Sequence, residues 1–327
     1  MSVRFSLSVE RWPLANVFTI ARGSKTEAVV VVAEIERDGV TGRGECVPYA
    51  RYGETVEGVI AAIEARRGLL EAGLGREALQ GAMPAGAARN AIDCAFWDLE
   101  AKREGRPAWQ LAGLPAPQPV ITAYTISLAE PEAMGEAAAK AAHRPLLKVK
   151  LGTADDAARI AAVRRNAPNS QLIIDANEGW RADNLAANLK ACADVGVVLI
   201  EQPLPSSDDG ALAHIDRPVP VCADESLHDR ASLPQLAGRY DAINIKLDKA
   251  GGLTEALALA RDAQALGLDL MIGCMVGTSL AMAPALLLGG QAKVIDLDGP
   301  LLLSRDREPG LHYEGSLVYP PEAGLWG

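Results

Sequence analysis

The sequence has few cysteines and no long apolar run. Its five cysteines are widely scattered and form no CxxC pair, which is typical of reduced thiols rather than of a disulfide framework or a zinc site. No stretch approaches the ~18 uninterrupted apolar residues of a membrane span. The first residues carry charges at Arg4, Glu10 and Arg11 and lack the apolar core of a signal peptide. We therefore expect a cytoplasmic protein that does not act at a membrane.

Positive charge is also in the minority. Lysine and arginine number 32 against 42 aspartates and glutamates, which gives a formal net charge of −10. Phosphate binding requires a basic face, so we expect a small-molecule partner and no nucleic acid. The 49% hydrophobic and 23% charged residues are typical of a globular chain and argue against disorder. A homo-oligomer is compatible with this composition.

Charged residues end a regular series of apolar, strand-like runs. The five clearest are Lys150, Asp175, Glu201, Asp224 and Lys246, at successive spacings of 25, 26, 23 and 22 residues. Each spacing is about the length of one strand, one loop and one helix. A charge at the end of a buried strand is costly to desolvate unless a site uses it or pairs it. The series therefore predicts a repeated βα unit and one shared site.

Further runs extend the series to eight strands. Residues 120–126, 268–273 and 294–298 are strand candidates, and helical patterns at 155–165, 184–195 and 253–266 lie between strands. Eight βα units predict a TIM-type barrel. No convincing amphipathic helix follows the last strand, so we expect an α/β (β/α)7β barrel.

The first third of the chain follows a different pattern. Runs 28–36 and 40–46 flank Asp38-Gly39, a hairpin signal, and residues 54–73 and 85–104 have helical spacing. The proline-rich stretch 115–119 is a plausible boundary. We predict an α+β capping domain over residues 1–115, a barrel over 116–308, and a tail from about 309 to 327 that packs back on the cap.

The carboxyl ends of barrel strands face the active site, so the charged residues are expected to converge. Asp175, Glu201 and Asp224 lie on three neighbouring predicted strands. Any one of them alone is equally compatible with a helix cap or a salt bridge. Three carboxylates in consecutive units repel one another unless a cation lies among them, and an all-oxygen site suits Mg²⁺.

Lysines flank this predicted metal site. Lys148 and Lys150 leave one face of the same strand, and Lys246 lies four strands farther round the ring. We expect desolvation and a nearby cation to lower their pKa values, so that either can act as a base near neutral pH. A metal-bound substrate carboxylate acidifies its α-proton. One lysine then removes that proton, and the other returns one from the opposite face.

These segments resemble the enolase superfamily, and within it the muconate-lactonizing subgroup. The resemblance covers nearly the whole chain and lies in Lys148-Val-Lys150, Asp175-Ala-Asn, Glu201-Gln-Pro, Ala223-Asp-Glu-Ser, the 244–252 segment and the cap segment 91–99. It implies that Asp175, Glu201 and Asp224 bind Mg²⁺ and that Lys150 and Lys246 form the acid/base pair. It also implies that Lys148 helps to hold charge on the enolate.

A second acidic pair narrows the expected substrate. Asp296 and Asp298 on the last strand face the same way, and this pair resembles the dipeptide epimerases, in which it binds the substrate's α-ammonium. The alternative is that the pair caps the barrel or forms a salt bridge with Arg305. Muconate cycloisomerase and o-succinylbenzoate synthase remain alternative activities, although their substrates carry no ammonium.

Side-chain specificity depends on two expected lid segments. Arg22 and Lys25 lie in one, Tyr52 lies in the other, and Cys274 and Met275 are expected to line the same pocket. A cationic lid favours an acidic side chain, as in L-Ala-D/L-Glu dipeptides of murein, and residues 20–24 resemble epimerases of that substrate. The alternative is that both cations are simply solvated.

Two other classes of protein remain open. A Schiff-base aldolase also places a lysine at a barrel strand end, but it does not account for three carboxylates in adjacent units. A binding protein that has lost catalysis would not need the complete set of predicted catalytic groups.

Overall fold

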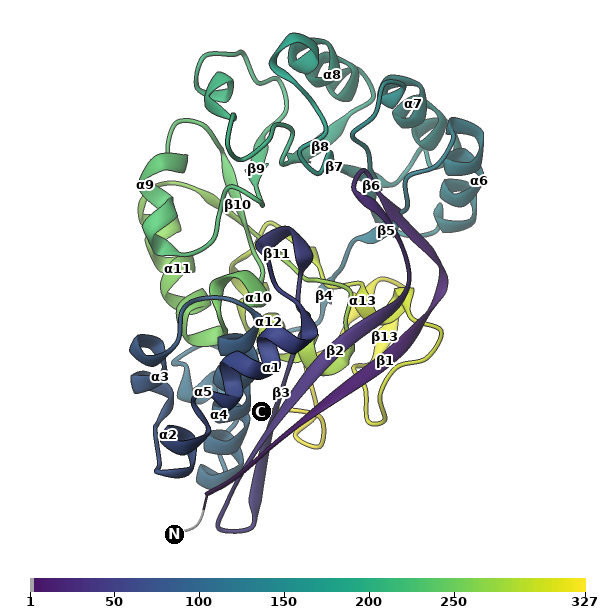
Figure 1. Cartoon of the computed structure of the whole chain (residues 1–327). Coiled ribbons are helices and arrows are strands. Elements are labelled where there is room, and N and C mark those ends of the chain that lie inside the picture. The colour runs from purple at the N-terminus through teal and green to yellow at the C-terminus, as the bar shows by residue number, and fades with distance from the viewer. Residues whose placement is uncertain (1–2) are drawn as a thin grey trace.

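The computed structural model describes residues 3–327, and its most extended element is an N-terminal antiparallel hairpin. Strand β1 (Val3–Ile20) pairs with β2 (Gly23–Arg37), which pairs in turn with β3 (Val40–Cys46). Figure 1 shows the hairpin of β1 and β2 running from the N-terminal end of the molecule to the region of β6. The sequence predicted β3 and only the second half of β2. Most of β1 is half-buried or exposed, so it lacks the apolar run that marks a buried strand.

Five helices complete the capping domain. They are α1 (Val56–Glu64), α2 (Arg67–Glu71), α3 (Arg76–Ala82), α4 (Ala87–Glu104) and α5 (Ala108–Leu111), with the short 3-10 helix η1 (Ala50–Tyr52) before them. The helix expected over 54–73 is therefore two helices, separated where the Arg66 side chain donates to the carbonyl oxygen of Ala82 at 2.9 Å. Helix α4 packs closely on β3. The absence of a side chain at Gly44 permits this approach, since a Cβ atom there would lie 2.1 Å from the carbonyl oxygen of Ala91.

Eight parallel strands form the second unit of the fold. They are β5 (Tyr124–Ile126), β6 (Leu146–Lys150), β7 (Gln171–Asp175), β8 (Val197–Glu201), β9 (Val221–Ala223), β10 (Ala242–Ile245), β11 (Asp269–Gly273) and β12 (Val294–Asp296), hydrogen-bonded in that order. The backbone N–H of Ala123 donates to Ile295 at 2.8 Å, which brings the first and last strands together. The predicted barrel with an N-terminal α+β cap is confirmed.

Helices follow most of the barrel strands. They are α6 (Pro131–Ala141), α7 (Asp156–Asn166), α8 (Ala182–Asp194), α9 (Leu233–Leu236), α10 (Leu247–Ala250), α11 (Leu253–Ala265), α12 (Ser279–Ala285) and α13 (Gly299–Leu302), with 3-10 helices η2 (Gly210–Ala213), η3 (Arg230–Ser232) and η4 (Leu286–Gln291). The units are less regular than predicted, because only η2 connects β8 to β9. That connection contains several prolines, which remove helical hydrogen bonds. Helix α13 is one turn long, as expected for a barrel without a full eighth helix.

The end of the chain contacts both units. Strands β13 (Tyr313–Glu314) and β14 (Leu317–Val318) form a small sheet with β4 (Val120–Ile121), which lies just before the barrel. Beyond this sheet, the indole of Trp326 donates to the carbonyl oxygen of Cys94 in α4 at 3.0 Å. The limits 1–115, 116–308 and 309–327 stay predictions.

One buried carboxylate also joins the cap to the barrel. Asp248 in α10 accepts hydrogen bonds from Asn90 of α4 at 2.8 Å and from the backbone of Val47 at 3.0 Å. Within residues 3–327, no helix is both long and apolar enough to cross a membrane.

Candidate active site

The inward-facing side chains of the barrel change from apolar to charged along four neighbouring strands, β6 to β9. An apolar layer near the amino ends of the strands consists of Ala123, Leu146, Ile173, Leu199, Cys222, Ala242 and Met271. Two residues later, side chains leave the same face. These positions include Lys148, Asp175, Glu201 and Asp224, all at most 2% exposed. The two-residue alternation of the strands therefore places the predicted charged side chains directly above a layer of buried apolar side chains.

The lysines and carboxylates meet in one ion-pair network. Lys148 Nζ lies 3.1 Å from Asp175, 2.6 Å from Glu201 and 2.7 Å from Asp296. On the far side, Lys246 Nζ lies 2.7 Å from Asp224 and 3.6 Å from Glu201. Residues that are up to 148 positions apart thus share one centre.

Lys150 completes this arrangement from the side of β6. Its Nζ lies 2.5 Å from Asp175, and three strands separate β6 from β10, after which Lys246 follows. The two lysines therefore approach the centre from opposite parts of the ring, as predicted.

The charges in the network control its protonation. Burial alone would lower the pKa of Lys246, but the charges of Asp224 and Glu201 outweigh it and raise this pKa well above its usual range. The pKa of Lys148 is raised in the same way by Asp296, Glu201 and Asp175 against the effect of burial. Burial and the charge of Asp175 raise the pKa of Glu201 to about 7. The sequence predicted lowered pKa values beside a bound cation. With only the carboxylates around them, the pKa values of Lys148 and Lys246 are raised instead.

Two side chains that sequence reasoning had not assigned hold Asp224 in place. Lys249 in α10 donates to its carboxylate at 2.5 Å and to its carbonyl oxygen at 2.6 Å. The Gln202 side-chain oxygen accepts from the backbone N–H groups of Asp224 at 2.8 Å and of Ser226 at 3.0 Å. The only signal in the sequence is position, because Gln202 directly follows Glu201 and Lys249 lies one helical turn after Lys246.

Asn244 plays a comparable part beside Glu201. Its side-chain N–H donates to Glu201 at 2.7 Å. Gly273 on β11 leaves the space that this side chain fills, since a Cβ atom there would lie 2.5 Å from the Asn244 oxygen. Both Asn244 and Glu201 are thereby fixed in the barrel interior.

The carboxylates are suitable ligands for a divalent cation in chemistry and in placement. Asp175, Glu201 and Asp224 offer only oxygen donors, which Mg²⁺ prefers. Lys148 bridges Asp175 and Glu201, and Lys246 bridges Glu201 and Asp224, so neighbouring carboxylates come within reach of a single cationic group. In their present rotamers they pair with lysines, and among the described residues no three acidic, cysteine or histidine side chains are already arranged to hold a metal ion.

The second acidic pair lies at the end of β12. Asp296 is the last residue of the strand, whereas Asp298 lies beyond it at the start of α13. Asp298 accepts a hydrogen bond from the backbone N–H of Thr125 at 2.8 Å, and burial together with the charge of Asp296 raises its pKa to about 7. One oxygen of Asp296 is buried without a hydrogen-bond partner. Both side chains are buried, and no ion pair to Arg305 is found in the described part of the chain.

A cavity of about 420 Å³ opens above the network, between cap and barrel. It is lined by seven of the predicted site residues: Arg22, Lys25, Lys150, Asp224, Lys246, Cys274 and Met275. Tyr52 lies just outside this lining and packs edge-on against His228, with 5.1 Å between the ring centres. Lys148, Asp175, Glu201 and the acidic pair lie outside the lining and are buried.

The expected lid segments are the tip of the long hairpin and η1. Arg22 at the tip already has acidic partners, because its guanidinium lies 2.7 Å from Glu225 and 3.3 Å from Glu178. Lys25 instead lies 5.1 Å from the ring centre of Tyr49 and forms no ion pair within the described residues. Burial lowers the pKa of Lys25. Of the two predicted cations, only Arg22 is ion-paired to the protein.

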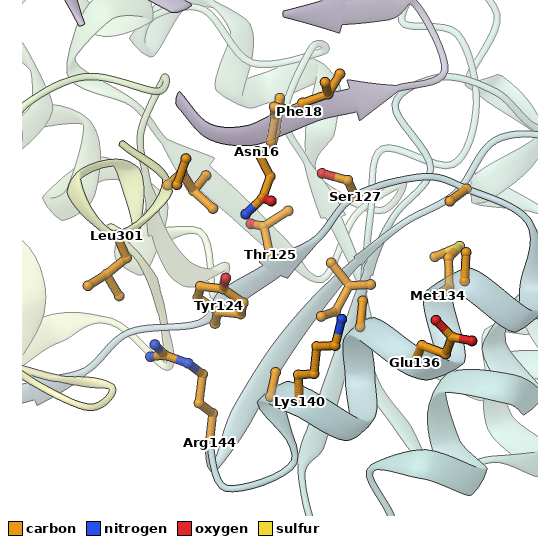
Figure 2. A pocket seen from close by; sticks show the side chains of 18 of the residues that line it. Asn16, Phe18, Tyr124, Thr125, Ser127, Met134, Glu136, Lys140, Arg144 and Leu301 are labelled. Carbon is orange, nitrogen blue, oxygen red and sulfur yellow. The ribbon is translucent and has the colours of Figure 1, made fainter. Parts of the chain in front are cut away.

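A second cavity, of about 450 Å³, lies beside β5 and α6. Figure 2 shows Asn16 and Phe18 of β1 on one side and Lys140 and Arg144 on the other. It is slightly larger than the first cavity, but it contains none of the predicted site residues. Phe18 lines both cavities. The buried charges identify the first cavity as the candidate active site.

Family models match both parts of the chain. The model for the mandelate racemase/muconate lactonizing enzyme N-terminal domain matches residues 3–113, and the enolase C-terminal domain-like model matches residues 133–323. The L-Ala-D/L-Glu epimerase of Escherichia coli is 51% identical over 93% of this chain and 95% of its own length. An N-acetyl-D-glutamate racemase from Pseudoalteromonas is 46% identical over 91% and 94%.

Solved structures show the same similarity. A crystal structure of an enolase family member from Agrobacterium tumefaciens, with bound sodium, L-Ala-L-Glu and an ordered loop, is 56% identical and covers 99% of this chain and 100% of its own, with a TM-score of 0.98. A dipeptide epimerase from Enterococcus faecalis, complexed with Mg and L-Leu-L-Tyr, is 30% identical over 100% of both chains, with a TM-score of 0.91.

Proposed function

Because the chain belongs to the mandelate racemase/muconate lactonizing enzyme family of the enolase superfamily, we propose that it is a dipeptide epimerase. It inverts the α-carbon of the C-terminal residue of a dipeptide by a two-base 1,1-proton transfer. The observation that carries this proposal is the placement of Lys150 and Lys246, which line one cavity from opposite parts of the ring. Two bases on opposite faces of one carbon are what inversion requires.

Asp175, Glu201 and Asp224 are the proposed ligands of a divalent cation, with Mg²⁺ as the proposed ion. When bound, such a cation supplies positive charge that stabilises the enolate and offsets the charge of the three carboxylates. Lys249 and Gln202 hold Asp224, and Asn244 holds Glu201, so these two ligands have fixed positions before substrate arrives. A fixed ligand set lowers the reorganisation needed when the substrate carboxylate binds.

The lysines carry the proton transfer. In each direction, the Nζ of one lysine must be neutral, which for Lys246 requires the charges of Asp224 and Glu201 to be offset. This Nζ takes the α-proton, and the C–H electron pair becomes the enolate. The Nζ of the other is an ammonium group and delivers its proton to the opposite face of the same carbon. Lys148, which shares Asp175 with Lys150 and Glu201 with Lys246, keeps its charge and stabilises the negative charge of the enolate. One proton leaves the substrate and one returns, so no oxidant or further reactant is needed.

Asp296 and Asp298 are the proposed site for the α-ammonium group of the dipeptide. The buried, unpartnered oxygen of Asp296 and the carboxylate of Asp298 can both accept from an ammonium donor. A substrate cation also relieves the repulsion between the two acids. Muconate and succinylbenzoate carry no such group, so this pair disfavours the cycloisomerase and succinylbenzoate synthase alternatives.

We propose L-Ala-D/L-Glu as the substrate, and turnover of murein peptides as its setting. The support is the cationic tip of the hairpin, with Arg22 and Lys25 in the lining of the cavity, and the similarity to an L-Ala-D/L-Glu epimerase. Cys274 and Met275 line the same cavity and are proposed contacts for the dipeptide, and Tyr52 is proposed to close it from the cap. Cytoplasmic localisation stays a prediction.

A second candidate activity is racemisation of an N-acylated glutamate. It is favoured by the 46% identity to an N-acetyl-D-glutamate racemase. Such a substrate shares the carboxylates of L-Ala-L-Glu but has no α-ammonium group. Comparison of the two substrates therefore tests the role of Asp296 and Asp298.

The test is deuterium incorporation from D₂O into L-Ala-L-Glu, followed by mass spectrometry and by chiral separation of the epimers. We expect Lys150→Ala and Lys246→Ala each to reduce epimerisation by about 10³-fold or more, since general acid/base groups contribute about 10²–10⁴-fold each. Lys190→Ala, on the exposed face of α8, is the matched control and is expected to retain the parent rate. Epimerisation at the parent rate by either site variant would exclude the two-base mechanism. Full activity after EDTA treatment would exclude the metal.

A further inference from the structure

Two segments of the cap reach the barrel mouth and contact the same residue there. The hairpin tip contributes Arg22, and η1 contributes Arg51. Arg51 forms two parallel hydrogen bonds to the carboxylate of Glu178, each 2.7 Å long, and Arg22 lies 3.3 Å from one of the same oxygens. Glu178 follows β7 in the barrel. A single barrel carboxylate therefore binds both cap segments.

Glu178 is also fixed to the barrel itself. Its carboxylate accepts from the backbone N–H of Ser206 at 2.9 Å, and its own N–H donates to the carbonyl oxygen of Gln202 at 2.9 Å. Its side chain is only 10% exposed. Charge-assisted, bidentate bonds to a largely buried carboxylate are stronger than exposed ion pairs.

The backbone at this point adopts an unusual conformation that presents the carboxylate to the cap. Asn177 and Glu178 have φ angles of 45° and 67°, in the left-handed region that side chains other than glycine rarely adopt. Gly179 makes the turn possible, because a Cβ atom there would lie 2.3 Å from the Cα atom of Gly152. Two adjacent left-handed residues persist only when the surrounding structure holds them, and such sites cluster at ligand clamps and active sites.

Arg22 connects this contact to the substrate cavity. It lines the cavity, and its second nitrogen lies 2.7 Å from Glu225, directly after the proposed ligand Asp224. The direction of its guanidinium is thus set by Glu178 on one side and Glu225 on the other.

We propose that Glu178 is a positioning residue that fastens the hairpin tip and η1 over the active site and so fixes Arg22 for the substrate. The effect on substrate rests on the proposed epimerase function, whereas the fastening itself does not. Glu178 acts through Arg22 and Arg51.

The first test is hydrogen–deuterium exchange of the full chain without ligand. Glu178→Gln removes the charge and keeps an acceptor for Ser206. We expect amide exchange to rise by about tenfold or more in both 19–25 and 49–53, because two charge-assisted contacts are weakened, while β6 to β8 stay unchanged. Glu27→Gln is the control. Glu27 pairs with Arg11 at 2.5 Å on the exposed part of the same hairpin, and its loss is expected to leave both segments as in the parent.

The second test is kinetic. For L-Ala-L-Glu, we expect Glu178→Gln to raise KM about tenfold and to change kcat less than about twofold, with a weaker dependence of KM on salt than in the parent. A variant that is only destabilised as a whole would not raise KM while leaving kcat almost unchanged. If the variant does not fold, Arg51→Gln, a change at a part-exposed side chain, must raise exchange in 49–53.

Two exchange results for Glu178→Gln would overturn the proposal: no change in either segment, or a rise confined to one of them. If the parent protein does not turn over any dipeptide, the proposed function fails, but the exchange measurement still tests the fastening.

Discussion

The replacement of Asp298 by asparagine tests how the site recognises the substrate's ammonium group. Asp298 is 4% exposed, and within residues 3–327 it has no lysine or arginine partner. It accepts a hydrogen bond from Thr125, which an asparagine oxygen can also accept. The substitution therefore removes the charge and keeps the shape. If the dipeptide ammonium pairs with this carboxylate, the variant loses a buried charge pair.

The size of the effect follows from the burial of the site. Removal of one partner from a buried ion pair costs about 3–5 kcal/mol, and about 1.4 kcal/mol corresponds to a tenfold change in rate. We expect kcat/KM for L-Ala-L-Glu to fall by about 150-fold or more. N-propionyl-L-glutamate has the same shape but no ammonium group, and its kcat/KM for α-proton exchange is expected to fall less than about threefold. The ratio of the two losses isolates the interaction between Asp298 and the ammonium.

The same comparison predicts a pH dependence. Burial and Asp296 raise the pKa of Asp298 to about 7, and the ammonium binds the ionised carboxylate. As pH falls from 8 to 6, the ionised fraction falls about tenfold. The preference of the parent for the dipeptide over N-propionyl-L-glutamate should decrease by the same factor. This dependence should be absent in Asp298→Asn.

The assay is deuterium exchange of both substrates, in the parent and the variant, at pH 6, 7 and 8. Asp269→Asn serves as the control, because Asp269 pairs with Lys293 on the surface at the opposite end of the barrel. Equal losses for the two substrates in Asp298→Asn would refute the assignment of an ammonium site, whatever their size.

Two further predictions concern stability. Burial raises the pKa of Asp93 from 3.8 to about 6 in spite of its bonds to Thr254 and Gln80, so the folded state binds the proton more tightly than the unfolded state. The parent should therefore lose up to about 3 kcal/mol relative to Asp93→Asn as pH rises from 4 to 6.5, in urea unfolding at each pH. Gly44→Ala should lower the free energy of unfolding by at least about 2 kcal/mol, because its Cβ meets helix backbone at 2.1 Å. Gly81→Ala, with open space around it, should cause no loss.

Much of the fold was predictable because the barrel repeats one simple pattern. Strands β6, β7 and β8 each consist of a short apolar run that ends in a charge, and helices of ordinary amphipathic pattern separate them. Strand β1 was missed because a half-exposed strand carries no comparable pattern. The regular spacing predicted a βα unit before β9, but only η2 lies there, because spacing alone does not distinguish a helix from a loop of equal length.

The site residues were predictable where a charged residue at the end of a barrel strand was enough to place the side chain in the site. The barrel period brings Lys148, Asp175 and Glu201 together wherever the helices lie. The supporting contacts were not predictable, because they depend on three-dimensional proximity. Nothing local to Glu178 indicates that two arginines from the cap reach it, and nothing near Arg22 indicates that its charge is already paired.

The position of the last residues has a consequence for synthesis of the protein on the ribosome. Leu325 and Trp326 are buried against the cap, where Arg43 donates to the Leu325 carbonyl oxygen at 2.8 Å and the N–H of Gly327 donates to Asp98 at 2.7 Å. The cap is translated first, yet part of its packing surface emerges after the whole barrel. We therefore expect the cap to complete its packing only after the barrel has been translated.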